Sequence, residues 1–362
     1  MSAIQSIFQR YTGRYLERYG HAMPAIHRKL IHAINSCRSG DLGSHLYKCQ
    51  ACGLVHMVPC SCGNRHCPTC QNEKASLWLG KQMSNLLPCP YFMITFTVPQ
   101  ELRGFIRSNQ RIAYGAMFDA AAGALRILAR DPRFVGADQI GFIGILHTWG
   151  RMLNYHPHIH FIVPAGGLSK DREQWLRSRP DFFIRVELLS VVYRAKFRDA
   201  MKRAGLFQEI DPRVWQKAWN VNSQAVGDGR SSLKYLTPYV FRVAIANSRI
   251  VNFDDDQVAF RYRISGSHRW RTISLDAMEF IRRFLQHVLP SGLMKIRHYG
   301  FLSGSAKTPA QRIRELICVL YELLEELAAP AQTPCRRRKM QCRQCGRRLS
   351  WMMFYPPTIR AG

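Results

Sequence analysis

The sequence predicts an α+β fold in which an antiparallel sheet is flanked by helices and preceded by a small cysteine-rich module. Three segments are rich in β-branched and aromatic residues, which is typical of buried strands: residues 91–98, 141–149 and 156–164. Apolar residues recur at helical spacing in the segments around them: residues 3–36, 100–130, 188–205 and 308–328. Seven of the twelve cysteines lie between Cys37 and Cys70, where the sequence shows little periodicity.

The link between the second and third strands predicts how they pair. Only Gly150 to Tyr155 separate them, a length typical of a hairpin, so we expect antiparallel pairing. A later hairpin is predicted from residues 257–264 and 270–275, which turn near residue 265.

Residues 308–328 form the clearest predicted helix. Thr308 is expected to cap its amino terminus, Pro309 suits the first helical position, and Gln311 completes a capping-box pattern. One apolar stripe follows at helical spacing: Ile313, Leu316, Ile317, Leu320, Leu323, Leu324 and Leu327. A basic tail that contains cysteines comes after Pro330.

Composition and charge restrict the classes of function. The 362 residues are 47% apolar, which suffices for the cores of two or three domains. Lys and Arg number 52 against 24 Asp and Glu, so the formal net charge of +28 favours a polyanionic partner, with nucleic acid ahead of a membrane surface. The sequence has no run of about 18 uncharged apolar residues and no signal-peptide core, so we expect a cytoplasmic protein without a membrane span.

Two Cys-x-x-Cys pairs, Cys49/Cys52 and Cys67/Cys70, are separated by fourteen residues. Cytoplasmic thiols stay reduced, so such pairs indicate a metal site more often than disulfides. Four thiolates at this spacing predict a zinc ribbon, because zinc accepts soft ligands in a tetrahedral arrangement. Basic residues flank the module and favour contact with DNA: Lys48, Arg65 and Lys74. The alternative is a zinc that only folds a short segment, and the two roles are compatible.

The remaining cysteines leave two questions open. A second zinc would draw its ligands from one set: Cys37, His45, Cys60, Cys62 and His66. His66 directly precedes Cys67, so it is equally suited to orienting a neighbouring ligand. Cys335 and Cys342-x-x-Cys345 give a weaker metal signal, since no fourth ligand stands nearby. The same tail carries a basic run that we expect to bind DNA phosphates: Arg336, Arg337, Arg338 and Lys339.

Two histidines stand two residues apart at the start of the third strand. Alternate residues of a strand share a face, so His158 and His160 should point to the same side and indicate a metal site. His147 on the paired strand is the first choice for a third ligand, because the hairpin places it roughly across from His158. His156 is the second choice, although Pro157 turns the chain directly after it.

Two tyrosines, Tyr235 and Tyr239, follow in a segment with helical character. Their spacing of four places both phenols on one face of a helix. Pro238 lies between them, and it can kink the helix or begin it. Core packing is the ordinary explanation for such a pair, and the histidines upstream favour a functional one.

Four sequence blocks together resemble a known family: CQACG…CSCGNRHCPTCQ, HTWG…HPHIHFIVP, YLTPYVFRVAIANSRI and KIRHYGFLS. They are similar to the rolling-circle insertion-sequence transposases of the two-tyrosine HUH endonuclease class, which have an amino-terminal zinc-binding domain. The resemblance extends from about Cys49 to Gly304. It implies an antiparallel-sheet HUH nuclease core and two catalytic tyrosines, Tyr235 and Tyr239.

The resemblance also implies a reaction that the residues fit. A divalent cation held by imidazoles, Mg²⁺ or Mn²⁺, polarises a phosphate, and a tyrosine attacks it to leave a 5′-phosphotyrosine. We expect single-stranded DNA as substrate. Four aromatic residues are candidates for stacking on bases, although core packing is the alternative for each: Trp149, Tyr155, Trp215 and Trp219.

Three domains are expected on this basis: residues 1–85 for zinc binding and DNA contact, 86–305 for catalysis, and 306–362 for a helix and basic tail. The expected partners are single-stranded transposon ends and target DNA, with host replication or helicase proteins, in the nucleoid of a bacterial cytoplasm. One alternative is a replication initiator or relaxase with the same chemistry. The other is a non-catalytic zinc-dependent DNA-binding protein, which leaves the histidine strand unexplained.

Overall fold

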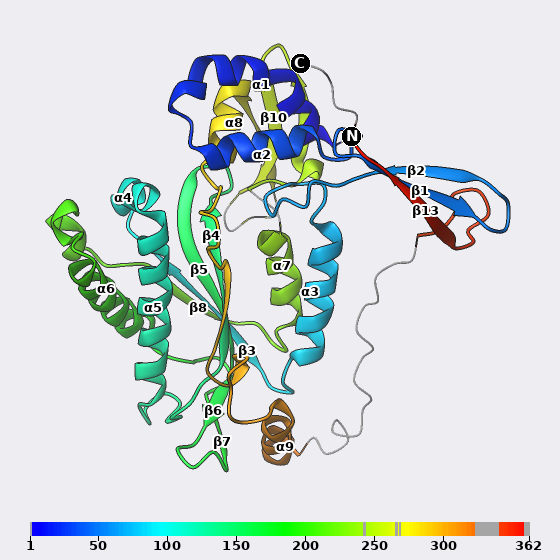
Figure 1. Cartoon of the computed structure of the whole chain (residues 1–362). Helices are drawn as coiled ribbons and strands as arrows, with labels where there is room; N and C mark the ends of the chain where they lie inside the picture. Colours follow the sequence, from blue (N-terminus) through cyan, green and yellow to red (C-terminus); the bar gives the residue numbers. More distant parts are fainter. Residues whose placement is uncertain (1, 242–243, 265–266, 268, 323–339, 358–362) are drawn as a thin grey trace.

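A five-stranded antiparallel sheet forms the centre of the protein, with the strand order β12-β4-β5-β3-β8 (Figure 1). The computed structural model describes residues 2–241, 244–264, 267, 269–322 and 340–357. The strands of the central sheet are β3 Tyr91–Thr97, β4 Phe142–Trp149, β5 Tyr155–Pro164, β8 Val221–Ala225 and β12 Ile296–Tyr299. The predicted α+β class with a mainly antiparallel sheet is confirmed.

The hairpin of β4 and β5 has the register that its short link predicted. His147 lies opposite His158, and a bulge follows between His147 and Trp149. Side chains of β5 alternate between the two faces of the sheet, so Ile159 packs in one core while Ile162 packs in the other.

Helices cover both faces of this sheet (Figure 1). One face is packed against α4 Leu102–Ser108, α5 Gln110–Ala129 and α6 Val186–Arg203. The other is packed against α3 Asn72–Asn85, α7 Arg230–Phe241 and α9 Ala310–Tyr321. Among the described helices, α5 alone is long and apolar enough by length and composition to cross a membrane, and 61% of its apolar window is buried inside the protein. Such burial is what the core helix of a folded domain requires.

A further layer caps one end of the sheet, at the top of Figure 1. It contains α1 Ala3–Tyr19, α2 Ala25–Asn35, α8 Ala277–Leu285 and a sheet of β9 Ile250–Asp254, β10 Gln257–Arg263 and β11 Trp270–Asp276. Phe8 of α1 meets Phe284 of α8 edge to face, with ring centroids 5.2 Å apart. This core also takes in Trp149 at the end of β4, which joins the layer to the central sheet. We call it the upper layer.

Part of the cysteine-rich segment, together with a carboxy-terminal strand, projects as an arm beside the upper layer (Figure 1). Its sheet has the order β13-β1-β2, with β1 Ser44–Cys49, β2 Val55–Pro59 and β13 Leu349–Tyr355. The carboxy-terminal strand β13 is thus hydrogen-bonded to β1 near the other end of the chain. We call this three-stranded unit the arm. The apolar core packed against α3, α7 and α9 crosses both predicted domain boundaries, at 85/86 and 305/306. The pairing of β1 with β13 also joins the first predicted domain to the last.

The helix predicted at 308–328 begins later than its sequence suggested. Pro309 occupies the N-cap position of α9, no side chain caps the helix, and Thr308 lies before it. The predicted capping box is therefore wrong, because the chain enters the helix from an extended Pro309. Leu323, Leu324 and Leu327 lie outside the described residues.

Shorter elements complete the described chain. A small hairpin pairs β6 Gly166–Leu168 with β7 Trp175–Arg177. The 3₁₀ turns are η1 Gly20–Ala22, η2 Phe207–Glu209, η3 Pro212–Trp215, η4 Asn247–Arg249 and η5 Gly300–Leu302.

Candidate nuclease site and cysteine clusters

Three buried histidines meet on the face of the central sheet that α7 covers. One nitrogen from each of His147, His158 and His160 lies within 4.8 Å of the others. His147 Nδ1 is 2.9 Å from His158 Nε2. The hairpin thus brings His147 to the pair on β5. The alternative third ligand, His156, lies with its Nδ1 2.7 Å from a guanidinium nitrogen of Arg103.

Hydrogen bonds from neighbouring groups orient two of these rings. His158 Nδ1–H donates to the carbonyl oxygen of His156 at 2.7 Å, which leaves Nε2 unprotonated on the side that faces His147. His160 Nδ1 is 2.8 Å from the hydroxyl of Thr95 on β3. Such outer contacts fix the ring orientation of metal-binding histidines.

Burial keeps the imidazoles neutral. Desolvation, reinforced by the neighbouring histidines, holds the pKa values of His147 and His158 well below the ordinary range. Desolvation lowers the pKa of His160 to about 4. Neutral imidazoles at physiological pH present lone pairs to a metal ion without first losing a proton.

A cavity of about 540 Å³ opens directly over the histidines. Residues of three structural units line it: Thr95, Thr97, His147, Trp149, Gly150, Arg151, His156, His158, His160, Tyr235, Arg249, Arg263 and Trp270. The central sheet provides the histidines, α7 provides Tyr235, and the upper layer provides Trp270. The cavity therefore exists only when these units are assembled.

Helix α7 presents one of the two predicted tyrosines to the cavity. Leu233 and Leu236 are buried in the core beneath the helix, whereas Tyr235 is 52% exposed and lines the cavity. Core packing therefore does not explain Tyr235. The helix continues through Pro238 to residue 241, so position 239 stays on the same helix, while the side chain of Tyr239 lies outside the described part of the chain.

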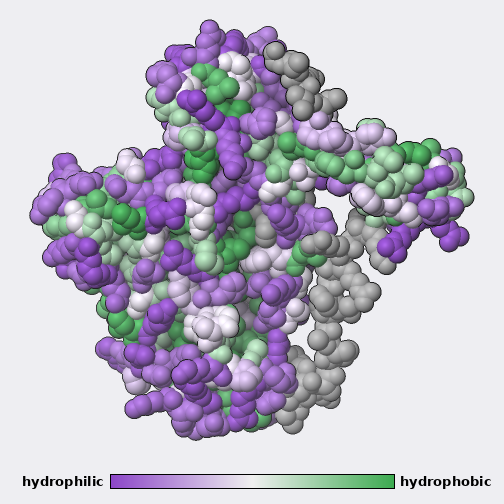
Figure 2. Space-filling model, in the orientation of Figure 1, coloured by the Kyte–Doolittle hydropathy of each residue, from purple (hydrophilic) through white to green (hydrophobic). Residues whose placement is uncertain are grey.

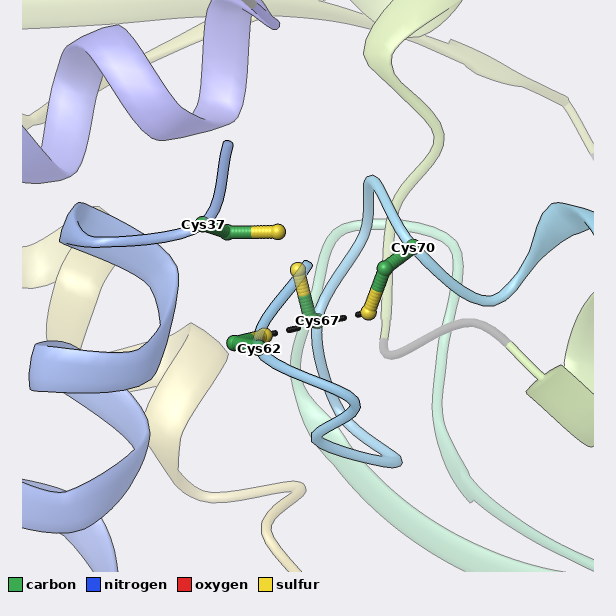
Figure 3. Close-up of side chains that lie close together, drawn as sticks. All are labelled: Cys37, Cys62, Cys67 and Cys70. Atoms are coloured by element: carbon green, nitrogen blue, oxygen red, sulfur yellow. Dashed lines mark hydrogen bonds between the residues drawn. The ribbon is translucent and has the colours of Figure 1, made fainter. Parts of the chain in front are cut away.

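Eight cysteines of the described chain form two clusters of four. In the first, the sulfurs of four residues lie within 4.8 Å of one another and turn toward a common centre (Figure 3): Cys37, Cys62, Cys67 and Cys70. Cys37 follows α2, and the other three come from the loop between β2 and α3. Hydrogen bonds from the other thiols of the cluster lower the pKa of Cys70, which favours a thiolate there.

The second cluster joins the two ends of the chain: Cys49, Cys52, Cys342 and Cys345. The backbone N–H groups of Cys52 and Ala51 lower the pKa of Cys49. In the same way, those of Cys345 and Gln344 lower the pKa of Cys342 to about 6. The single site predicted from Cys49, Cys52, Cys67 and Cys70 is therefore wrong, since each pair belongs to a different cluster. The reason is topological, because β1 carries the first pair into the arm and the second pair stays beside α2.

The predicted ligands for a second zinc are partly brought together. Cys37 and Cys62 join the first cluster. His45 and His66 do not, because His45 Nδ1 accepts from the indole of Trp351 and His66 Nε2 accepts from the amide of Leu289, both at 3.2 Å. Among the described residues, Cys60 belongs to neither cluster. One cysteine of the tail and the basic run predicted to bind DNA phosphates lie outside the residues that the structure describes: Cys335, Arg336, Arg337, Arg338 and Lys339.

Comparisons with known proteins match two separate segments of the chain to family models. Residues 141–310 match a family described as a putative transposase, and residues 7–98 match a transposase zinc-binding domain. The putative transposase y4qJ of Sinorhizobium fredii (strain NBRC 101917 / NGR234) is 34% identical over 94% of this chain and 92% of the relative. The transposase for insertion sequence element IS801 of Pseudomonas savastanoi pv. phaseolicola is 26% identical over 83% and 74%, respectively. The chain belongs to the rolling-circle insertion-sequence transposases. No solved structure matches it.

The matched segments of this transposase contain all of one cysteine cluster but only half of the other. The zinc-binding segment contains the whole first cysteine cluster, whose four sulfurs are close enough together to hold one metal ion. Of the second cluster it contains only Cys49 and Cys52, because Cys342 and Cys345 lie beyond both matched segments.

The upper layer adds residues to the transposase cavity that the sequence did not reveal. Arg263 and Trp270 face each other across the β10–β11 hairpin, and the indole of Trp270 is 55% exposed. Arg249 donates from Nε to the carbonyl oxygen of Arg261 at 2.7 Å, which fixes it beside the hairpin. The hairpin itself was predictable, but its place beside the histidines depends on tertiary packing.

The earlier stacking candidates lie mainly in the cores of the transposase. Trp149 is buried, with its ring centroid 4.0 Å from that of His147, and Trp215 and Trp219 stack on each other at 6.0 Å. The ammonium of Lys295 lies 4.9 Å from the centroid of Trp149, and desolvation lowers the pKa of this lysine to about 7. Trp270, in contrast, lines the cavity with an exposed indole.

Proposed function

We propose that this transposase cuts and rejoins single-stranded DNA at transposon ends through a 5′-phosphotyrosine intermediate. Tyr235 and Tyr239 act as nucleophiles, and His147, His158 and His160 hold one divalent cation. The observation that carries the proposal is the single cavity in which the three neutral imidazoles and the Tyr235 phenol lie together.

The donor set fits a divalent cation. Three imidazole nitrogens favour Mn²⁺ by ligand type, whereas cellular abundance favours Mg²⁺. When bound, the cation supplies Lewis-acid polarisation of the scissile phosphate and stabilises its developing charge. Thr95 contributes indirectly, since its hydroxyl holds the His160 ring at 2.8 Å.

The reaction exchanges one phosphoester for another. The Tyr235 oxygen bonds to phosphorus as the bond from phosphorus to the 3′ oxygen breaks, and the phenol proton is lost while the released 3′ oxygen gains one. The free 3′-hydroxyl can later reverse the step and rejoin the strand, so no ATP is consumed. A second tyrosine on the same helix lets the enzyme hold a second strand end.

The cavity lining favours single-stranded DNA. Arg249, Arg263 and Arg151 present guanidinium groups, which bind phosphates in a forked geometry. The exposed indole of Trp270 offers a stacking surface for an unpaired base. Cationic and aromatic groups in one groove are typical of proteins that bind single strands.

Binding to single-stranded DNA should depend steeply on salt. Each phosphate contact adds about −0.7 to the slope of log affinity against log salt concentration. The Arg263→Ala variant should make the slope shallower by about this amount, as measured by fluorescence anisotropy with a labelled oligonucleotide. Arg133→Ala, which removes an exposed arginine paired with Asp131, is the control and should leave the slope unchanged. A flat response in the wild type would contradict the role given to the cationic lining.

A covalent capture assay tests the function itself. Wild-type enzyme is incubated with Mn²⁺ or Mg²⁺ and a single-stranded oligonucleotide that spans a transposon end, and the products are separated under denaturing conditions. We expect an adduct that contains only the DNA on the 3′ side of the cut. Nicked DNA without an adduct would indicate hydrolysis, and binding without cleavage would indicate a non-catalytic DNA-binding protein.

A further inference from the structure

We propose that Cys49, Cys52, Cys342 and Cys345 bind one Zn²⁺ ion that fastens the carboxy-terminal strand to the amino-terminal module. This ion is additional to the zinc of the first cluster. Half of its ligands lie outside both segments that match transposase families. The inference does not depend on the cleavage chemistry.

The sulfur positions fit a tetrahedral metal site. Cys49 and Cys345 sulfurs are 3.4 Å apart, those of Cys52 and Cys342 are 3.6 Å apart, and those of Cys52 and Cys345 are 3.7 Å apart. Zinc–sulfur bonds of about 2.3 Å place the corners of a tetrahedron about 3.8 Å apart. The sulfurs are too far apart for disulfides, whose S–S bonds are about 2.05 Å long, and all four cysteines are free.

The two halves of the site are built alike. Each is a Cys-x-x-Cys-Gly turn in which the glycine has a positive φ, +72° at Gly53 and +71° at Gly346. In each turn the glycine amide donates to the carbonyl of the first cysteine at 2.9 Å. The amide of the first cysteine donates to the carbonyl five residues later, at 2.9 Å from Cys49 and 2.7 Å from Cys342. Two matched turns facing each other are the expected frame for four thiolates around one ion.

Apolar packing is too slight to hold the arm together. Its buried core consists of Cys49, Cys342 and Leu349, with Tyr47 packed at the side. Many large apolar and aromatic side chains of the arm are instead exposed: Leu54, Val55, Met57, Trp351, Met352, Met353, Phe354 and Tyr355. Figure 2 shows hydrophobic residues along the visible face of the arm. Without β13 the arm would be the two-stranded hairpin of β1 and β2, which is marginal in water, and a small unit with so little core commonly requires a metal or a disulfide. Zinc accounts for the ordered pairing of β13 with β1.

His56 supports the second half of the site from β2. Its Nε2 lies 3.3 Å from the Cys342 sulfur. A hydrogen bond at this distance neutralises part of the charge that four thiolates carry around one zinc ion. His56 is therefore a positioning residue in the proposed site.

Zinc analysis of the full-length protein, purified under reducing conditions, tests the proposal. Wild-type protein should contain two zinc ions per chain. The Cys342→Ser, Cys345→Ser variant should contain one, and so should the Cys49→Ser, Cys52→Ser variant, because each removes half of the same site. The control Cys60→Ser changes a cysteine directly after β2 that belongs to neither of these clusters, and this variant should retain two zinc ions.

Amide hydrogen exchange measures which strands the second zinc ion stabilises. In the Cys342→Ser, Cys345→Ser variant, amides of β1 and β13 should exchange at least about tenfold faster than in the wild type. Amides of β4 and β5 should stay protected, which establishes that the variant is folded. Two zinc ions in this variant, one zinc ion in the wild type, or an intact mass showing disulfides among these cysteines would each overturn the proposal.

Discussion

The Tyr235→Phe variant should lose the covalent protein–DNA adduct formed in the first cut, with the rate of cleavage reduced by at least about 10³-fold. Phenylalanine keeps the ring and removes only the attacking oxygen. The ring is half exposed and lies above the buried Leu233 and Leu236, so the free energy of unfolding should change by less than about 0.5 kcal/mol. Adduct formation on a labelled single-stranded transposon end, separated under denaturing conditions, measures the loss.

Comparison with Tyr239→Phe separates the two nucleophiles. If Tyr235 makes the first cut, the Tyr239→Phe variant should still form one adduct and fail when both ends must be held at once. The double variant should form none. Tyr19→Phe, which changes an exposed tyrosine on α1, serves as the control and should behave like the wild type. An adduct that persists in the double variant would place the nucleophile elsewhere.

The second large effect should come from the histidines. The His158→Ala, His160→Ala variant should lose binding of the catalytic divalent cation and reduce cleavage by at least about 10³-fold. Only His147 of the three imidazoles then remains, and one neutral nitrogen binds Mn²⁺ or Mg²⁺ poorly. Calorimetric titration with Mn²⁺ measures the binding, and the zinc content should not change because both cysteine clusters remain intact.

Two single variants decide the third ligand. His147→Ala should weaken Mn²⁺ binding strongly, whereas His156→Ala should leave it nearly unchanged, because the His156 ring contacts Arg103. The opposite order would exchange their roles. Undiminished cleavage by the His158→Ala, His160→Ala variant would refute the metal site as a whole.

Local sequence was enough to predict the frame of the candidate site. The β-branched runs and the short link from Gly150 to Tyr155 determine both the β4–β5 hairpin and its register, so the meeting of His147 with His158 follows from local rules. Alternation along β5 then adds His160 to the same face. Such short-range signals survive folding because no distant partner competes with them.

Distant partners explain what sequence reasoning missed. Two Cys-x-x-Cys pairs close in sequence resemble one zinc ribbon. Nothing in the local sequence shows that Cys49 lies instead beside Cys345, which is 296 positions further along the chain. One signal was present, since a glycine follows Cys52 and Cys345 but glutamine follows Cys70. The cationic lining from Arg249 and Arg263 was also missed, because it depends on how the upper layer docks onto the sheet.

The pairing of β13 with β1 also sets the order in which the protein can be completed during translation. The ribosome makes β1 early, but its partner strand emerges only after about three hundred further residues. At about 5 to 20 residues per second, β1 waits on the order of 15 to 60 s with one edge unpaired. The arm is therefore begun early and completed only when the last strand has been made. A chain that ends before β13 has an open strand edge on β1, where aggregation can begin.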